Sequence, residues 1–312
     1  MSRPERTGGA RAISAGEAVA AAVAVAEEHG ITVREPVVLT DSYNLRIHLR
    51  PAPVVARVPT VTALARLRPE EAMRRELAVV SFLHGRGAPV VPPSDLLPAR
   101  VHEHGGTPVS YWQYVEHVEH VEHAEHAEHA EHDGSPVTPE AFGRALRELH
   151  EELRGFPGAL PRLGPVLDEP RHLLGLLSGE LEPDVLARLA EARDGLAARL
   201  PDGGQAVHGD AHPGNLLVTP GGLLWNDFEE TMSAPVGWDL ACLLRTVRLD
   251  GRAAVRAYGA DPDDPALAVF TEARTLQAVL WTLVRALRFP EERAAARATL
   301  DGWLRDPTRR TR

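Results

Sequence analysis

An aspartate and an asparagine five residues apart, with a second aspartate twelve residues further on, could bind a metal ion and position a hydroxyl for attack. The first two lie in His208–Asn215, which reads His-Gly-Asp-Ala-His-Pro-Gly-Asn, and the second acid is Asp227. One carboxylate can orient the attacking hydroxyl, while the other two oxygen-bearing side chains hold the metal. This arrangement is typical of a magnesium-dependent phosphoryl transferase.

The glycines and the proline inside this motif exclude a helix. His208 and His212 have a spacing that would chelate zinc on a helix, but a loop does not offer that geometry, so zinc is the weaker alternative. Two carboxylates and an amide around one point require a cation, and oxygen ligands favour magnesium. A second alternative is an ordinary turn in which Asp210 and Asn215 only accept hydrogen bonds from backbone amides.

The segments around the motif predict strands that would place these polar residues together. Strands are expected at Gln205–His208, Leu216–Val218 and Leu223–Asp227, and the last two are joined by a turn that returns Asp227 to the motif. The remainder of this half has apolar residues at helical spacing. We expect helices at 139–153, 182–200, 238–247, 265–287 and 290–304.

The first third of the chain has a different pattern. Ser14 and Glu17 have capping-box spacing and open a helix that ends near Gly30. Runs rich in Val, Leu and Ile then alternate with turn residues, which predicts a small α+β lobe. Strands are expected at 36–41, 45–50, 54–58, 100–104 and 109–115, with a helix at 69–85.

We therefore expect three regions. Residues 1–115 would form a small nucleotide-binding lobe, 116–135 a low-complexity insertion, and 136–312 a helical catalytic and substrate lobe. A cleft between two lobes is a common place for a ligand.

The motif resembles the His-Gly-Asp-x-x-x-x-Asn loop of the aminoglycoside phosphotransferase family, which is related to the protein kinases. Asp227-Phe228-Glu229 resembles that family's metal-binding motif. The resemblance implies a bilobal, protein-kinase-like α+β fold. It also implies that Asp210 is the catalytic base and that Asn215 and Asp227 hold magnesium.

Two further residues follow from the same resemblance. His208 would pack the loop, and Asp239, within Trp238-Asp239-Leu240-Ala241, would support it. The alternative for Asp239 is a cap at the surface end of a helix.

The resemblance extends to the nucleotide site. Kinases place a lysine on the third strand and pair it with a helix glutamate to bind the phosphates. This chain contains no lysine, and Arg57 occupies the corresponding strand, with Glu76 as its expected partner. The alternative for Arg57 is a solvated strand arginine.

Three segments would complete the ATP site. The turn containing Ser42 and Asn44 would cover the phosphates, although it lacks the glycines of a protein-kinase loop. Gln113 and Val115 would lie at the hinge against which adenine packs.

Composition limits the remaining function classes. The net charge of −10 argues against general nucleic-acid binding, and no apolar run is long enough to span a membrane. The absence of lysine excludes a Walker-type phosphate loop and a lysine Schiff base. Cys242 is the only cysteine, so we expect no internal disulfide and a cytoplasmic protein.

Residues 116–132 consist of Val-Glu-His and Ala-Glu-His triplets and contain six of the 15 histidines. On an α-helix a three-residue period does not keep histidines on one face, because each triplet drifts by about 60°. We interpret the repeat as an inert insertion. Weak binding of Zn²⁺ or Ni²⁺ is the alternative.

These observations predict an ATP- and Mg²⁺-dependent phosphotransferase that acts on a hydroxyl of a small molecule. Glu229, Glu230, Asp261, Asp263 and Asp264 could attract a cationic amino sugar, or could be solvated surface. Two other classes stay open. One is a kinase-like sensor without strong catalysis, and the other is a metal-dependent phosphohydrolase that uses the Asp-x-His pair.

Overall fold

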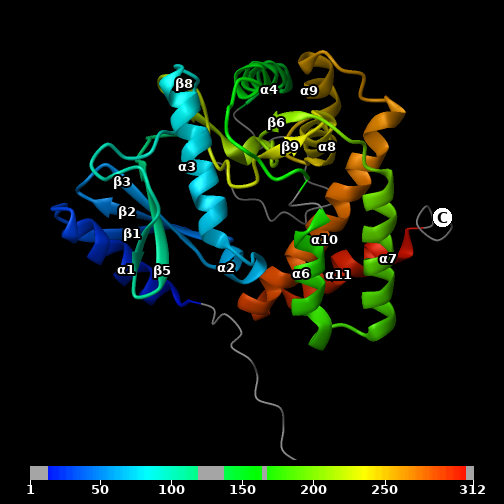
Figure 1. Cartoon of the computed structure of the whole chain (residues 1–312), viewed down its shortest axis with the longest axis horizontal. Coiled ribbons are helices and arrows are strands. Elements are labelled where there is room, and N and C mark those ends of the chain that lie inside the picture. The colour runs from blue at the N-terminus through cyan, green and yellow to red at the C-terminus, as the bar shows by residue number, and fades with distance from the viewer. Residues whose placement is uncertain (1–12, 119–136, 164–166, 307–312) are drawn as a thin grey trace, which may run out of the picture.

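The computed structural model describes residues 13–118, 137–163 and 167–306. Figure 1 shows a five-stranded sheet with its helices beside a larger, mostly helical part. This architecture confirms the expected α+β, protein-kinase-like fold class. The boundaries at residues 115 and 135 stay a prediction, and most of the Glu-His repeat lies outside the described residues.

The sheet is antiparallel throughout and has the order β1-β2-β3-β5-β4. The predicted strands are all present, with ends that differ by one or two residues from the expected ones. Their bounds are β1 Glu35–Asp41, β2 Asn44–Arg50, β3 Val54–Pro59, β4 His102–His104 and β5 Thr107–Gln113.

Alternation along the strands divides the sheet into an apolar face and a face directed at the rest of the molecule. On β3, Val54, Ala56 and Val58 are buried against α1 (Ala15–Glu28), whose capping box at Ser14 is formed as predicted. Side chains at the alternate positions, including Arg57, point to the opposite face. There α3 (Pro69–Gly85) brings Glu76 to Arg57.

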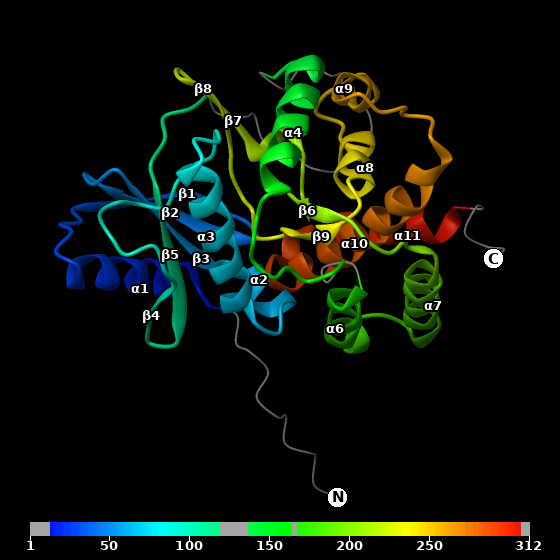
Figure 2. The ribbon, with the colours of Figure 1, turned by 45° about the horizontal axis from the view of Figure 1, so that its top comes forward.

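The helical part is arranged around α10, which packs against α6, α7, α8 and α11 and also against α2 of the sheet-bearing part (Figure 2). The α-helices are α2 Val61–Ala65, α4 Pro139–Leu153, α6 Glu169–Leu176, α7 Pro183–Arg199, α8 Gly237–Arg245, α9 Gly251–Tyr258, α10 Ala268–Arg288 and α11 Arg293–Arg305. Short 3₁₀ turns are η1 Leu177–Gly179, η2 Pro213–Asn215, η3 Pro265–Leu267 and η4 Pro290–Glu292.

Some elements were not predicted from the sequence. The helices α2, α6 and α9 have five to eight residues, too few to show a clear helical period. The expected helices at 265–287 and 290–304 each begin with a 3₁₀ turn whose first residue is a proline. The three-residue strand β9 (Met232–Ala234) also carries no pattern of its own.

Two small pairs of antiparallel strands flank the polar motif and position it. β6 (Gln205–Val207) pairs with β9, and β7 (Leu216–Thr219) forms a hairpin with β8 (Gly222–Trp225). The segment after α3 joins this hairpin: the Val91 N–H donates to the Trp225 carbonyl at 2.9 Å, and the Trp225 N–H donates to the Pro89 carbonyl at 2.8 Å. The motif is therefore fixed against the sheet-bearing part as well as the helices.

None of the helices in the described part of the chain has the length and apolar character that crossing a membrane requires.

Candidate active site

Asp239, in the first turn of α8, is fully buried and holds the loop that follows β6. Its Oδ2 accepts the His208 N–H at 2.8 Å, and its Oδ1 accepts the Gly209 N–H at 2.9 Å. His150 Nε2 lies 2.9 Å from the same Oδ2, and Trp238 Nε1–H donates to the Gly209 carbonyl at 2.7 Å. Asp239 is thus an internal support for the loop and does not cap a helix at the surface.

Asp239→Asn is expected to lower the free energy of unfolding by about 1–3 kcal/mol, because an amide nitrogen would face a buried donor. Asp250→Asn is the matched control. Asp250 caps α9 by accepting the Ala253 N–H at 3.0 Å, and asparagine caps a helix equally well. Urea unfolding of both variants measures the difference, and equal losses would refute the role of Asp239.

Gly209 has a φ of +90°, and a Cβ at this position would overlap the backbone carbonyl of Glu230. Gly222 also has a positive φ, +118°, but a Cβ there would meet nothing within 4 Å. Both positions need a glycine for their conformation, yet only Gly209 needs it for space.

Gly209→Ala is therefore expected to destabilise the protein by more than the ~1–2 kcal/mol that a left-handed conformation costs at Gly222→Ala. The overlap also moves the backbone next to Asp210, so we expect weaker activity in Gly209→Ala alone. Thermal unfolding and activity of the two variants check this, and indistinguishable variants would show that the close approach is unimportant.

His208 is buried between Trp225 and Phe228, whose ring centroids lie 5.2 and 4.6 Å from its own. Its Nδ1 accepts the Asp210 N–H at 3.3 Å, and its Nε2–H donates to the Asn226 carbonyl at 3.1 Å. Burial keeps the pKa of His208 below its ordinary value, against the opposing effect of nearby acids. Both ring nitrogens have protein partners, so this histidine packs the loop and does not serve as a zinc ligand.

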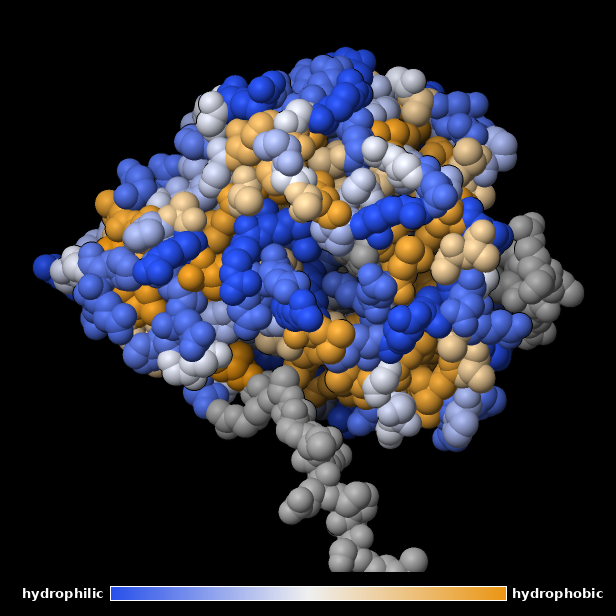
Figure 3. Space-filling model, viewed as in Figure 1, coloured by the Kyte–Doolittle hydropathy of each residue, from blue (hydrophilic) through white to orange (hydrophobic). Residues whose placement is uncertain are grey.

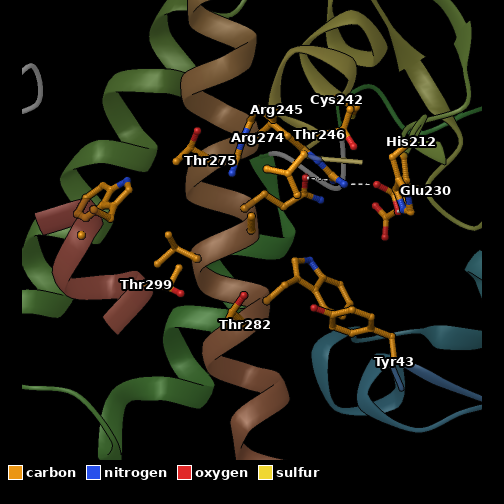
Figure 4. A pocket seen from close by; sticks show the side chains of 18 of the residues that line it. Tyr43, His212, Glu230, Cys242, Arg245, Thr246, Arg274, Thr275, Thr282 and Thr299 are labelled. Carbon is orange, nitrogen blue, oxygen red and sulfur yellow. Dashed lines mark hydrogen bonds and ion pairs between the residues drawn. The ribbon is translucent and has the colours of Figure 1, made fainter. Parts of the chain in front are cut away.

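Asp210, from the same loop, pairs through its Oδ1 with the guanidinium of Arg274 on α10. Figure 4 shows Arg274 on the side of the cavity that faces His212 of this loop. His212 Nε2 lies 3.4 Å from Oδ2, and Asn215 Nδ2 donates to the Asp210 carbonyl at 2.9 Å. Burial alone would raise the pKa of Asp210, but the adjacent Arg274 and His212 hold it well below its usual range. The side chain of Asp210 is therefore ionised at neutral pH.

Asp227 follows β8 with a φ of +64°, a left-handed conformation that is uncommon outside glycine. This conformation ends the strand at Trp225, so the sequence-based strand through 227 was too long. Asp227 Oδ1 accepts a hydrogen bond from Arg57 Nη2 at 2.7 Å, and Oδ2 accepts one from Arg46 Nη2 at 2.7 Å. Burial raises the pKa of Asp227, but the two guanidinium groups lower it further, leaving it below the ordinary value.

Arg57 is buried and lies between three carboxylates. Its Nη1 donates to Glu76 Oε1 at 2.6 Å, and its Nη2 lies 2.7 Å from Asp227 Oδ1 and 2.6 Å from Glu229 Oε2. Glu76 Oε1 also accepts the Phe228 N–H at 3.0 Å. Burial, only partly offset by Arg57, raises the pKa of Glu76 to about 7. Arg57 is thus an internal cation and not a solvated strand residue.

Arg46 was not identified from the sequence, although a signal was present. It lies directly across from Arg57 in the pairing of β2 with β3. Along β2, Leu45, Ile47 and Leu49 are fully buried, so the residues between them must face the other way. That alternation places Arg46 beside Arg57 on the face directed at Asp227.

Arg274 and Arg66 were also missed. Arg274 pairs with a residue 64 positions earlier in the chain. Arg66, after α2, pairs with Glu169 on α6 and with Glu229 and Glu230, and so links the sheet-bearing part to the helices. Neither contact leaves a local signal in the sequence.

A narrow cavity of about 110 Å³ lies between the sheet and the β7–β8 hairpin. Gln113, Val115, Arg57, Glu76 and Asp227 are among the residues that line it. The expectation that adenine packs against Gln113 and Val115 stays a prediction. Apolar walls of the cavity include Val55, Val80, Val91 and Leu217. Among the described residues, the Val115 N–H has no hydrogen-bond partner. It can therefore donate a hydrogen bond to an acceptor atom on the edge of a planar ring.

A larger cavity of about 900 Å³ adjoins the first and is bounded by the motif loop, α10 and α11. Asp210 and Asp227 line it together with threonines and aromatic residues. Figure 4 labels Thr275, Thr282 and Tyr43 among them. Figure 3 shows the molecular surface hollowed near the centre of the view, where hydrophilic residues gather. Asp227 lines both cavities and therefore lies at their junction.

Ser42 and Asn44 line neither cavity. The Ser42 hydroxyl pairs with Arg285 of α10, while Asn44 Nδ2 donates to both oxygens of Glu229 at 3.2 Å. Thr62 Oγ1–H donates to Asn44 Oδ1 at 2.6 Å. The contact with phosphates that the sequence predicts for this turn stays a prediction.

Asn215 and Asp227 carry oxygen atoms of the kind that magnesium prefers, and both Asp227 oxygens now accept from arginines. Asn215 uses its Nδ2 toward Asp210, which leaves its Oδ1 available. No group of three or more His, Cys, Asp or Glu side chains in the described ranges is arranged to hold a metal. Magnesium in nucleotide sites uses one or two protein ligands plus substrate phosphates and does not need such a group. The donor set fits an ion that arrives with a polyphosphate.

Comparison with known proteins identifies the family of this chain. Residues 19–274 match the model of the phosphotransferase enzyme family (APH). No significant match was found among curated proteins.

Solved structures share the fold at low sequence identity. APH(2")-IIia, solved with GDP and kanamycin, is 15% identical over 87% of this chain and 93% of its own, with a TM-score of 0.58. Choline kinase LicA from Streptococcus pneumoniae is 14% identical over 89% and 98%, with a TM-score of 0.57. Amicoumacin kinase hAmiN, solved with AMP-PNP and Ca²⁺, is 15% identical over 89% and 91%, with a TM-score of 0.61. Because the family model covers most of the chain, this protein belongs to the phosphotransferase enzyme family.

Proposed function

We propose that this protein transfers the γ-phosphate of ATP to a hydroxyl group of a small molecule, with Mg²⁺ as the metal. The observation that carries the proposal is the position of Asp227 at the junction of the two cavities, with Asp210 in the larger one. A nucleotide in the narrow cavity would direct its phosphates to that junction. An acceptor in the larger cavity would then meet the phosphates beside Asp210.

The chain's own residues would bind the nucleotide at three places. The Val115 N–H and the apolar walls receive the adenine ring, and Arg57 and Arg46 donate to the phosphates. Kinases usually bind the phosphates with a single lysine. Here two guanidinium groups would take its place, and because arginine donates in a planar fork they offer more N–H donors. AMP-PNP and GDP in the neighbouring structures support a nucleoside polyphosphate as the donor.

Asn215 Oδ1 and an oxygen of Asp227 would hold the magnesium ion, which neutralises charge on the phosphates when it is bound. Asp227 now pairs with Arg46, whose side chain is 34% exposed and is free to move to a phosphate oxygen. Arg57 would keep its Nη1 on Glu76, and its Nη2, now beside Asp227, is the group that would donate to a phosphate.

Asp210 would orient the acceptor hydroxyl for in-line attack. Its low pKa makes Asp210 a poor proton acceptor before the reaction starts, so its main contribution is to orient the hydroxyl. It would accept the hydroxyl proton only as the bond between the acceptor oxygen and the γ-phosphorus forms. Positioning supplies much of the rate in phosphoryl transfer, because the protein does little covalent chemistry.

Titration of ATP with and without Mg²⁺ separates the three function classes. The phosphotransferase proposal expects binding that Mg²⁺ strengthens and that Asp227→Asn weakens, with ADP released once a suitable hydroxyl compound is present. Absence of nucleotide binding would favour a ligand sensor. Nucleotide binding with the same affinity with and without Mg²⁺ would count against a kinase. Phosphate-ester cleavage without nucleotide would favour a hydrolase.

The cytoplasmic location is part of this proposal. It is supported by the single cysteine, Cys242, which is buried.

A further inference from the structure

The acids that surround the larger cavity near the motif are already bound to arginines. Asp210 pairs with Arg274, and Glu230 pairs with Arg66. Asp227 and Glu229 share Arg57, and each has a second guanidinium partner. Of the acids that the sequence suggested for a cationic sugar, Asp261, Asp263 and Asp264 do not line this cavity.

Two guanidinium groups lie beside the motif loop on the cavity side. Arg274 contacts Asp210 and is held over the Trp238 ring at 6.0 Å, with its Nη1 donating to Gln277 Oε1 at 2.7 Å. Arg248 lies against Gly214, so closely that a Cβ there would overlap its Nη1. Among the described residues, no carboxylate lies within ion-pair distance of Arg248 (4.0 Å). Thus one cation that lines the cavity beside Gly214 has no acid within ion-pair distance in the described part of the chain.

The walls around these cations suit a molecule rich in hydroxyl groups. Thr246, Thr275, Thr282 and Thr299 line the cavity from α10, α11 and the end of α8 (Figure 4). Tyr43 and Trp281 form an aromatic side of the cavity, with ring centroids 5.5 Å apart. Threonine hydroxyls both donate and accept, and aromatic faces pack against sugar rings or other flat apolar surfaces.

We propose that the acceptor carries an anionic group, a carboxylate or a phosphate, near its reactive hydroxyl, and that Arg248 and Arg274 bind it. This inference rests on the proposed phosphotransferase function. Guanidinium groups bind both anions through paired N–H donors. A cationic acceptor would instead lie next to Arg248 and would have to displace existing ion pairs to reach an acid near the motif loop.

The same arrangement gives Arg274 a second partner. When the acceptor's anion approaches, Arg274 can move from Asp210 Oδ1 to that anion. Asp210 is then open to the acceptor hydroxyl, so the recognition of the anion and the freeing of Asp210 occur together.

Four related sugars test the inference: glucuronate, glucose 6-phosphate, glucose and glucosamine. Calorimetry measures their binding to the full-length protein, and ADP release with Mg·ATP measures their turnover. We expect glucuronate or glucose 6-phosphate to bind about ten-fold more tightly than glucose and glucosamine, as expected for a charge-assisted hydrogen bond. The comparison of the two acids shows whether carboxylate or phosphate is the preferred anion.

Arg248→Gln should abolish most of this preference, because it removes the cation without touching Asp210. Arg305→Gln is the matched control: Arg305 also lines the cavity but is exposed, and its Nε donates to the Asp301 carbonyl at 3.1 Å. We expect Arg305→Gln to keep the wild-type preference.

Three results would overturn the inference: glucose or glucosamine binding as tightly as the acids, no binding of either acid, or a preference that survives Arg248→Gln. The proposed function is tested separately by the turnover data. Phosphorylation of glucosamine in preference to the acids would sustain the phosphotransferase and refute anion recognition. Arg248-dependent binding of an acid without phosphorylation of any acceptor would support anion recognition and refute the phosphotransferase function.

Discussion

Asp210→Asn is expected to slow phosphoryl transfer by about 10²–10⁴-fold while Mg·ATP binding stays near the wild-type value. Asparagine keeps the shape of the side chain but loses the charge that orients the acceptor hydroxyl. Asp210 lines only the larger cavity, whereas the nucleotide residues line the narrow one. The variant should therefore lose turnover and keep its nucleotide.

ADP release gives the rate, and calorimetric titration gives the affinity for Mg·ATP. The variant also removes a charged partner of Arg274, so its melting temperature has to be measured beside its activity. Asp301→Asn, on α11, is the control for loss of an acid elsewhere, because Asp301 forms an exposed ion pair with Arg297. Undiminished turnover by Asp210→Asn would remove this residue from the mechanism.

Arg57→Ala is expected to lower the free energy of unfolding by about 3–5 kcal/mol, because it leaves the acids around Arg57 buried without their shared cation. Glu76 would be the most affected, since Arg57 Nη1 is its charged partner at 2.6 Å. Affinity for Mg·ATP should also fall, because Arg57 is the buried donor that we propose for the phosphates. Urea unfolding and nucleotide titration measure the two effects.

Arg57→Lys separates charge from geometry at this position. Lysine keeps the positive charge but not the planar fork that reaches Glu76, Asp227 and Glu229 together. We expect it to lie between wild type and Arg57→Ala in stability. Arg46→Ala, at a side chain 34% exposed, should cost much less. Equal unfolding midpoints for wild type and Arg57→Ala would contradict the central place of this arginine.

The sequence contained the residues of the site but not all of their partners. Asp210, Asn215 and Asp227 could be found because glycines, a proline and a hairpin turn determine their local backbone. Arg57 could be found from the position of its strand, and Glu76 from the helix that follows. The left-handed conformation of Asp227 could not be read, because aspartate permits it without requiring it.

Contacts between elements that are distant in the sequence could not be predicted from the sequence. The pairing of Arg274 with Asp210 requires α10 to lie against α8, which no local pattern specifies. The same holds for Arg66, which joins α2 to Glu169 and Glu230. These missed contacts change the chemical interpretation. Of the acids that suggested a cationic acceptor, Glu229 and Glu230 pair with buried arginines, and the three aspartates at 261, 263 and 264 do not line the larger cavity.

The most direct test of the proposed function follows the γ-phosphate itself. Wild-type protein is incubated with Mg²⁺, ATP labelled in the γ-phosphate and a panel of hydroxyl compounds, and the products are separated. We predict that the label appears in a phosphate ester of one acceptor, requires Mg²⁺ and is lost in Asp210→Asn. Label that stays in ATP, or that appears only as inorganic phosphate with every acceptor, would contradict the assignment as a small-molecule phosphotransferase.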